Sequence, residues 1–190
     1  PSTMIRAGFL PLVDAAILKP LPVNAPDSLV ILEWTNDGFP PDVENHNGEY
    51  IPIAEGRFKG SSIAAHLYRR LAREQTVFES LIGVAAYPDA VAIVVDTRSA
   101  EQASLQYVSS NYFQGLRVEP VLGRPFRDDE DRIGAEPSVI VSHRYWVNQL
   151  GRDPRVFDRA IRINNVPARI VGIAPAGFFG LRTGQWPDMY

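Results

Sequence analysis

Residues 159–173 read RAIRINNVPARIVGI, and this stretch predicts a β-hairpin that sets the character of the fold. Apolar residues recur on both sides of Asn164 and Asn165, which predicts two strands, 159–163 and 166–173, joined by a two-residue turn. A tight turn of this kind needs a positive φ at both central residues, and asparagine tolerates that better than most residues. The C-terminal part of the chain is therefore expected to contain antiparallel strands.

Short strands and capped turns are also predicted on the N-terminal side of this hairpin. The run Val139-Ile140-Val141 predicts a buried strand, and Ser142 after it can cap a helix that carries Trp146. Further strands are predicted at 28–34, 83–87, 90–97 and 101–108. Because strands and helices do not alternate regularly, we expect an α+β chain with short strands and hairpins, and not a regular βαβ array.

The remaining segments are predicted to be helices, turns and loops. A helix capped by Ser61 or Ser62 should carry the apolar stripe Ile63, Leu67 and Leu71. The motif Thr76-x-x-Glu79 matches a capping box, which predicts a second short helix over 77–82. The other predictions are a helix at 3–18, a long irregular connection at 35–60, a helical turn at 109–113, and loops at 121–126 and 174–185.

Composition places the chain among globular proteins and excludes several classes of function. Of its 190 residues, 45% are apolar and 22% are charged, which suffices for a buried core. The formal net charge is −3 and no long basic run exists, so nucleic-acid binding is not expected. Arg69, Arg70 and Arg73 come closest to such a run, and they are more simply a solvated helix face. The absence of cysteine excludes disulfides, cysteine metal sites and thiol nucleophiles.

No apolar run reaches the roughly 20 residues that a membrane-spanning helix needs. The stretch from Ile5 to Leu18 comes closest, but Arg6, Pro11 and Asp14 interrupt it. Taken alone, these residues favour an amphipathic helix packed on the domain over the outer end of a membrane helix. There is no signal peptide, and both ends of the chain are expected to be cuts from a longer protein.

The densest charge cluster is Asp128-Asp129-Glu130-Asp131. Four carboxylates could hold a hard cation such as calcium, but the spacing is not that of an EF-hand loop. The stronger interpretation is an acidic start of a helical turn, where carboxylates complement the positive end of the helix dipole. We therefore predict no metal site in the chain.

The pair Ser142-His143 is the only candidate for nucleophilic catalysis that the sequence suggests. A serine nucleophile needs a base in reach and an oxyanion hole, and the Gly-x-Ser-x-Gly elbow is absent here. The histidines His46, His66 and His143 are scattered, and no glycine-rich phosphate loop occurs. The chain is therefore expected to be no enzyme, with no catalytic, cofactor-binding or metal-binding residue.

Aromatic side chains could line a ligand cleft, although core packing explains most aromatics in globular proteins. The relevant residues are Tyr112, Phe113, Phe126, Trp146, Phe178, Phe179 and Trp186. Both interpretations stay open from the sequence.

An ordered series of short motifs resembles the MacB-like periplasmic core domain of ABC-type permeases, especially the large bacterial permeases that carry two such domains. The motifs are Val108-Ser109-Ser110-Asn111-Tyr112-Phe113, Leu122-Gly123-Arg124-Pro125-Phe126, Val139-Ile140-Val141-Ser142, Trp146, Asp153-Pro154, Ile161-Arg162-Ile163-Asn164, Ile170-Val171-Gly172-Ile173-Ala174-Pro175, Gly177-Phe178 and Pro187-Asp188. Each is weak alone, but their order over about 80 residues is specific.

The first half of the chain matches the same family more loosely. Residues 15–22 are similar to the exit of the first membrane helix in these permeases, and Phe78-Glu79-Ser80-Leu81 also fits. The family usually has glycine where this chain has Arg117, Asp158 and Asn165, and glycine supplies a positive φ at little cost. Asn165 can substitute for glycine, Gly115 could relieve the turn near Arg117, and Asp158 is the weakest match.

The resemblance implies a two-part fold in which a porter-like β-α-β half carries an inserted mixed α/β subdomain of the Sabre type. Residues 1–27 would be the outer end of the first membrane helix and a connector, 28–88 the first porter half, and 89–190 the Sabre-like part. The second porter half would follow Tyr190. By this resemblance the 3–18 helix becomes part of a membrane helix.

The resemblance also implies a function without catalysis. The chain would be an extracytoplasmic domain of an inner-membrane permease that couples ATP-driven helix motion to export or release of a substrate. ATP would be bound by a separate cognate ATPase. The other implied partners are a second permease copy or pseudo-dimer half, and a periplasmic adaptor as a further candidate. The alternative is a ligand- or partner-binding module whose pocket is lined by the aromatic loop 178–186.

Overall fold

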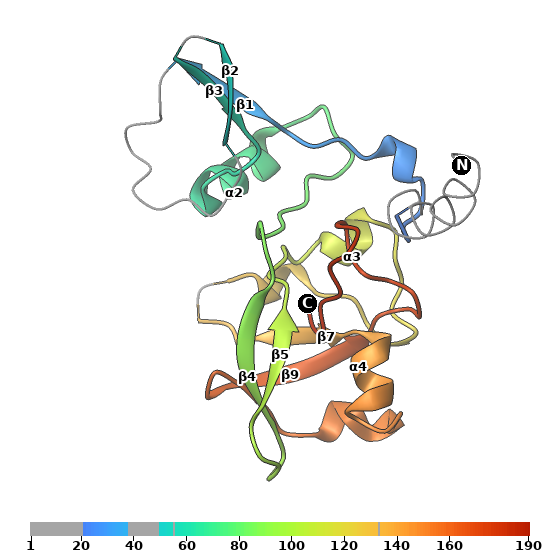
Figure 1. The fold of residues 1–190 in the computed structure, drawn as a ribbon. Helices are drawn as coiled ribbons and strands as arrows, with labels where there is room; N and C mark the ends of the chain where they lie inside the picture. Colours follow the sequence, from blue (N-terminus) through green and yellow to red (C-terminus); the bar gives the residue numbers. More distant parts are fainter. Residues whose placement is uncertain (1–20, 38–49, 55, 133) are drawn as a thin grey trace, which may run out of the picture.

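The computed structural model describes residues 21–37, 50–54, 56–132 and 134–190. The predicted helix at 3–18 lies outside these residues. The described chain is of the α+β class, as predicted, and its strands form two separate sheets (Figure 1).

The smaller sheet has three antiparallel strands in the order β1-β3-β2. They are β1 (Trp34–Asp37), β2 (Tyr50–Ala54) and β3 (Arg57–Gly60). The prediction of an irregular connection over 35–60 is therefore wrong for the described residues. These strands hold Asn, Asp, Gly and Pro, so backbone pairing overrides a weak local preference.

The strand predicted at 28–34 is also wrong except for Trp34. Residues Pro26–Ser28 form a single 3₁₀ turn, and Val30 and Ile31 are 67% and 81% exposed. An apolar run becomes a strand only where another strand pairs with it, and no described strand pairs with this run.

Helix α2 (Ala65–Glu74) follows the smaller sheet, so the described order over 28–88 is β1-β2-β3-α2. The helix begins after Ala64, and neither Ser61 nor Ser62 caps it. The predicted second helix at 77–82 is wrong as well. The side chain of Gln75 accepts hydrogen bonds from the amides of Val77 and Phe78, at 3.0 and 2.8 Å, in place of the predicted capping box.

The larger sheet has the order β5-β4-β8-β9-β6, and β7 pairs with β9 in parallel. Its strands are β4 (Asp89–Val95), β5 (Glu101–Leu105), β6 (Leu122–Gly123), β7 (Ser138–Val141), β8 (Ile161–Ile163) and β9 (Val166–Ile173). The predicted strands at 90–97, 101–108 and 139–141 are confirmed with shifted ends. The run at 83–87 contributes only an isolated bridge between Val84 and Val108, and two residues of the predicted 121–126 loop pair with β9 as β6.

The β8–β9 hairpin is as predicted. Asn164 and Asn165 have φ values of 48° and 67°, and Ile163 pairs with Val166 across the turn. The side chain of Asn164 also accepts a 2.9 Å hydrogen bond from the amide of Ala92, which ties the turn to β4.

The larger sheet closes on itself through the segment Asp188–Tyr190. Met189 bridges to Leu105 of β5 in parallel and to Val141 of β7 in antiparallel. The amides and carbonyls of Ile140 and Tyr190 bond to each other at 3.0 and 2.9 Å. A continuous ring of backbone pairing thus runs β5-β4-β8-β9-β7 and back to β5 through 188–190. We call residues 84–190 the closed body.

Short helices and turns surround the closed ring (Figure 1). They are α3 (Tyr112–Gly115), α4 (His143–Asn148), and 3₁₀ turns at Asp128–Glu130 and Pro154–Asp158. The predicted acidic turn and the predicted helices after 109 and 142 are confirmed in these places. No helix in the described residues is long and apolar enough to span a bilayer.

The closed body contains two packed cores. One is aliphatic and is centred on the strands, with Ile93, Val141 and Ile173 fully buried. The other is aromatic and lies around α3, with Tyr112 and Phe113 fully buried. Val23 and Leu29 of the N-terminal connector pack against the aromatic core.

Two of the three non-glycine residues that depart from the family pattern have positive φ. Arg117 has a φ of 53° and Asn165 one of 67°, whereas Asp158 is not among the residues with positive φ. Asp158 ends a 3₁₀ turn, so no glycine is needed there. Gly115 does not relieve the turn; a Cβ at this residue would lie 2.6 Å from the Ile82 side chain, so the position requires a close approach.

Candidate functional site

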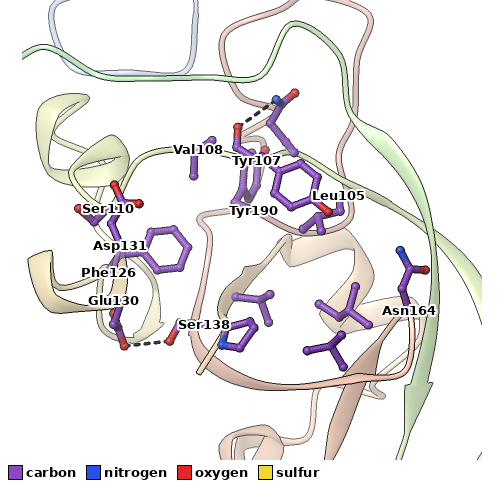
Figure 2. Close-up of a pocket in the computed structure, with 15 residues that line it drawn as sticks. Leu105, Tyr107, Val108, Ser110, Phe126, Glu130, Asp131, Ser138, Asn164 and Tyr190 are labelled. Atoms are coloured by element: carbon purple, nitrogen blue, oxygen red, sulfur yellow. Dashed lines mark hydrogen bonds between the residues drawn. The ribbon is translucent and has the colours of Figure 1, made fainter. Parts of the chain in front are cut away.

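A groove of about 410 Å³ opens at one end of the closed body (Figure 2). Its walls are the end of β5, the start of β7 and the turn between β8 and β9. Figure 2 shows Glu130 bonded to Ser138 on one side of the groove, with Asn164 across from them. The lining residues are Leu105, Gln106, Tyr107, Val108, Ser110, Phe126, Glu130, Asp131, Pro137, Ser138, Val139, Ile163, Asn164, Val166 and Tyr190.

Sequence reasoning did not predict this groove, because its walls come from segments that are far apart along the chain. No local signal marks it, since Gln106 follows the mixed polar and apolar strand β5 and Ser138 is the first residue of β7. Gln106 is buried, and its side-chain amide donates a 2.8 Å hydrogen bond to the carbonyl of Ala85.

Glu130 is the best-connected charged group at the rim of the groove. Its carboxylate accepts hydrogen bonds from Arg124 at 2.5 and 3.0 Å, from the Ser138 hydroxyl at 2.9 Å and from the Arg127 amide at 2.7 Å. The bond from Arg124 contributes most to lowering the pKa of Glu130 to about 2. The carboxylate is therefore ionised and fully engaged in holding the turn.

The acidic cluster 128–131 acts as the start of a 3₁₀ turn, as predicted. The reciprocal bond between Glu130 and the Arg127 amide is the second half of a capping box. Asp131 lies 3.9 Å from Arg69, and Asp129 lies 3.9 Å from Arg132. Within the described residues, no three His, Cys, Asp or Glu side chains gather closely enough to hold a metal ion.

Ser142 is the helix cap that the sequence predicts. Its hydroxyl accepts a 3.2 Å hydrogen bond from the Tyr145 amide, and its side chain is buried. The His143 ring packs edge-on against Trp146 at 5.6 Å between centroids. The described contacts therefore give Ser142 and His143 separate structural roles.

The C-terminal segment is held by polar contacts in addition to its strand pairing. Asp188 accepts a 3.0 Å bond from the Ser104 amide and a 2.7 Å bond from Arg144. Beside it, the hydroxyl of Tyr145 donates to Glu101, and burial raises the pKa of Tyr145 above its usual value. These contacts fix the segment that closes the ring.

Most of the aromatic side chains pack in the core, which was one of the two interpretations that the sequence left open. Tyr112, Phe113, Phe126, Phe178 and Tyr190 form one cluster with ring centroids 5.4–6.3 Å apart. Burial raises the pKa of Tyr112 and of Tyr190, and neither hydroxyl has a hydrogen-bond partner among the described residues.

The pocket that the 178–186 loop was predicted to line lies between the two subdomains and stays a prediction, because this loop takes no part in the groove. None of its residues lines the groove. Phe178 and Phe179 are buried, and the Trp186 ring packs at a tilt against Phe179, with 5.1 Å between centroids, while staying 49% exposed. The loop packs on the closed body because burial of the apolar area of its aromatic rings stabilises this position.

A narrow set of contacts joins the smaller sheet and α2 to the closed body. The Tyr68 hydroxyl donates a 3.1 Å bond to the carbonyl of Leu81, and Arg69 faces Asp131. Arg117 pairs with Glu79 at 2.7 Å, and both side chains are exposed. We call β1, β2, β3 and α2 the outer unit, and residues 75–83 the joint.

The arginines of α2 are solvated, as predicted from the sequence. Arg69 is half-exposed, Arg70 pairs with Glu74 one turn along the helix, and Arg73 is exposed. Such pairs contribute little to stability.

Comparison with known proteins gives one family and several structures of similar fold. A family model described as the MacB-like periplasmic core domain matches residues 23–189. No curated protein matches the chain.

Three solved structures are similar at low identity. The periplasmic region of MacB from Actinobacillus actinomycetemcomitans has a TM-score of 0.47 and 17% identity, over 56% of this chain and 48% of that one. The extracellular domain of the ABC-type transporter YknZ from Gram-positive bacteria has a TM-score of 0.44 and 16% identity, over 57% and 52%. A domain of a permease protein from Porphyromonas gingivalis has a TM-score of 0.44 and 11% identity, over 65% and 49%. This chain thus spans about half the length of each.

Proposed function

The chain belongs to the family of MacB-like periplasmic core domains, and from this premise we propose that it couples ATP-driven motion of membrane helices to export or release of a substrate. In this proposal it has no catalytic residue. It lies outside the inner membrane, and a separate cognate ATPase binds the nucleotide. A second permease copy or pseudo-dimer half completes the assembly, and a periplasmic adaptor is a further partner to be tested.

The observation that carries the proposal is the difference in internal tethering between the closed body and the outer unit. All strands of the body except β6 are tied into one ring of backbone hydrogen bonds, and two buried cores fill the body. Packed cores of this kind are hard to deform, so the body moves as one piece.

The outer unit and the joint are attached to that body by a small number of polar contacts, of which the ion pairs are exposed. The Tyr68 hydroxyl bonds to Leu81 of the joint and to Asn111 of the body, at 3.1 and 3.5 Å, and Arg69 pairs with Asp131. The joint itself is held to the body by the Arg117–Glu79 pair and by hydrogen bonds of Asn111 and Ser109. Exposed ion pairs of this kind stabilise a contact only weakly. The joint can therefore change its geometry while the body keeps its own, as hinge motions between rigid parts require.

The test is to lock the joint chemically, which is simple because the chain contains no cysteine. Cysteines replace Arg69 and Asp131 in the full-length permease, freed of other cysteines and reconstituted with its ATPase. A short cleavable bis-thiol reagent then links them. We expect ATP turnover to fall by about fivefold or more, the lower range of typical coupling energies, and to recover after cleavage.

The matched control links two residues inside the closed body. Glu136 and Arg169 form an exposed pair at 2.7 Å, so cysteines there accept the same reagent without bridging the joint. This link should leave ATP turnover unchanged. Equal turnover with and without the Arg69–Asp131 link would overturn the coupling proposal.

A ligand-binding role is the alternative, and the groove is the feature that favours it. Its volume lies in the range of small-molecule sites, and most of its lining side chains are apolar. The polar groups at its rim are already satisfied, since Glu130 bonds to Arg124 and Ser138. In contrast, backbone groups in the walls of the groove have no hydrogen-bond partner, and this indicates an occupant other than a small molecule.

A further inference from the structure

The two long walls of the groove are strand edges with free backbone groups. In β7, Val139 and Val141 direct their backbone groups to β9, because the amide of Arg169 bonds to Pro137 and that of Ala174 to Val141. Successive residues of a strand face opposite edges. The backbone amide and carbonyl of Ser138 therefore point into the groove. They lie on the same edge of β7 as the amide and carbonyl of Ile140, which bond to Tyr190.

The opposite wall repeats this arrangement in the segment that follows β5. The backbone amide of Gln106 donates to the Met189 carbonyl at 2.9 Å. On the other edge, the Tyr107 carbonyl accepts from the Ala85 amide, and the Ser109 amide donates to the Gly83 carbonyl. By the same alternation, the carbonyl of Gln106 and the amide of Val108 face the groove. No described residue bonds to the amide of Val108, and the pairing of β7 with β9 uses Pro137 and Val139, which leaves the amide of Ser138 without a partner.

The segment Asp188–Tyr190 runs directly toward this gap. It pairs parallel to β5 and antiparallel to β7, and Tyr190 itself lines the groove. A strand that kept this course would reach the free groups of Gln106, Val108 and Ser138 in register. Both of its edges would be paired, which is the geometry of strand addition to a sheet.

We propose that the groove is the seat of one further β-strand, which continues Asp188–Tyr190 in register and is supplied by the permease polypeptide beyond Tyr190. This source is the one for which the register is already set by existing hydrogen bonds. The proposal is independent of the coupling function. In this proposal the groove is the place of a strand in the sheet and is not a ligand pocket.

The side chains of the walls also specify the kind of strand. Met189 points into the aliphatic core, and Tyr190 points into the aromatic core on the other face. Because the side chains of a strand alternate, the first added residue shares the face of Met189. That face leads to Leu105, Val139 and Ile163, so an apolar residue is expected there.

The experiment compares amide hydrogen exchange in the 190-residue chain and in the full-length permease in detergent. The amides of Val108 and Ser138 should exchange at least about tenfold more slowly in the permease, as expected when open strand edges become paired. The Ala85 amide, already bonded to Tyr107 at 2.9 Å, is the matched control and should be protected in both.

The other outcomes overturn the proposal. Fast exchange at Val108 and Ser138 in both proteins would mean that no strand occupies the groove. Protection in both would mean that residues up to Tyr190 already cover these edges. Loss of the coupling effect in the cross-linking experiment would leave these exchange results unaffected, so the two proposals fail separately.

Discussion

The closed body buries its apolar residues, whereas the outer unit leaves its apolar residues partly exposed to solvent. In the body, strand and helix residues such as Ile140 and Phe113 have no exposed surface. In the outer unit, the best apolar candidates stay half-exposed, with Leu67 at 46%, Leu71 at 42% and Ile51 at 47%. No apolar residue of 34–37, 51–54 or 56–74 is buried.

The difference shows that the two regions are stabilised by different forces. Burial of apolar area stabilises a fold by about 25 cal/mol per Å², and the body collects most of this gain. The outer unit depends on strand pairing and on exposed ion pairs such as Arg57–Asp37, which contribute little. The outer unit is therefore the part of the described chain that opens or moves at the lowest free-energy cost.

The largest expected effect separates the two regions directly. Phe113→Ala removes a fully buried ring that contacts Phe126, Phe178 and Tyr190, and it should lower the free energy of unfolding by about 3–5 kcal/mol. Leu67→Ala is the control and should cost less than about 1 kcal/mol. Urea unfolding followed by tryptophan fluorescence measures both. Similar losses in the two variants would mean that the outer unit shares the core of the body.

The second effect concerns charge, and it sharpens the same contrast. The side chain of Glu130 is 17% exposed and bonded to Arg124, whereas that of Glu74 in α2 is 63% exposed. We expect Glu130→Gln to cost about 1–3 kcal/mol near pH 7 because charge-assisted bonds at a shielded site are lost. Glu74→Gln should cost no more than about 0.5 kcal/mol.

The pH dependence of the Glu130 contribution has a definite sign. Folding lowers the pKa of Glu130 from 4.5 to about 2. A lowered pKa gives a contribution that is complete above about pH 5 and is lost as the pH falls toward 2. Unfolding measured at pH 7, 4 and 3 should therefore show the wild type losing more stability than Glu130→Gln. Parallel losses would contradict the assignment of the low pKa to this carboxylate.

The parts of the fold that the sequence predicted are those set by local signals. Asn164-Asn165 fixes a tight turn, Ser142 caps the next helix, and Asp128–Asp131 starts a helical turn, all through contacts within a few residues. These features depend on φ preferences and on near-neighbour hydrogen bonds. Their sequence motifs are therefore sufficient to place them.

The parts that the sequence did not predict depend on pairing between distant segments. The closing segment 188–190 lacks strand-like alternation, and only its partners in β5 and β7 make it a strand. The strands β2 and β3 contain Pro52 and Gly60, which are unfavourable inside strands, although Ile51 and Ile53 alternate in β2. The groove is invisible in the sequence for the same reason, since its walls meet only in the folded chain.

The smallest expected effect lies at the joint, where the two regions meet. Arg117 has a φ of 53°, a conformation that strains any residue with a Cβ, and its side chain pairs with Glu79 of the joint. Arg117→Gly relieves the backbone and removes the ion pair, whereas Arg117→Ala removes the ion pair and keeps the strain. We expect the glycine variant to melt about 2–4 °C higher than the alanine variant in thermal unfolding.

The pair of Arg117 variants also separates backbone strain from tethering of the joint. Because the Arg117–Glu79 pair is exposed, its loss in both variants should change the melting temperature little. If alanine and glycine melt together, the left-handed backbone at 117 is not strained in solution. If both melt well below the wild type, the ion pair holds the outer unit more firmly than its exposure implies, and the joint is stiffer than the coupling proposal requires.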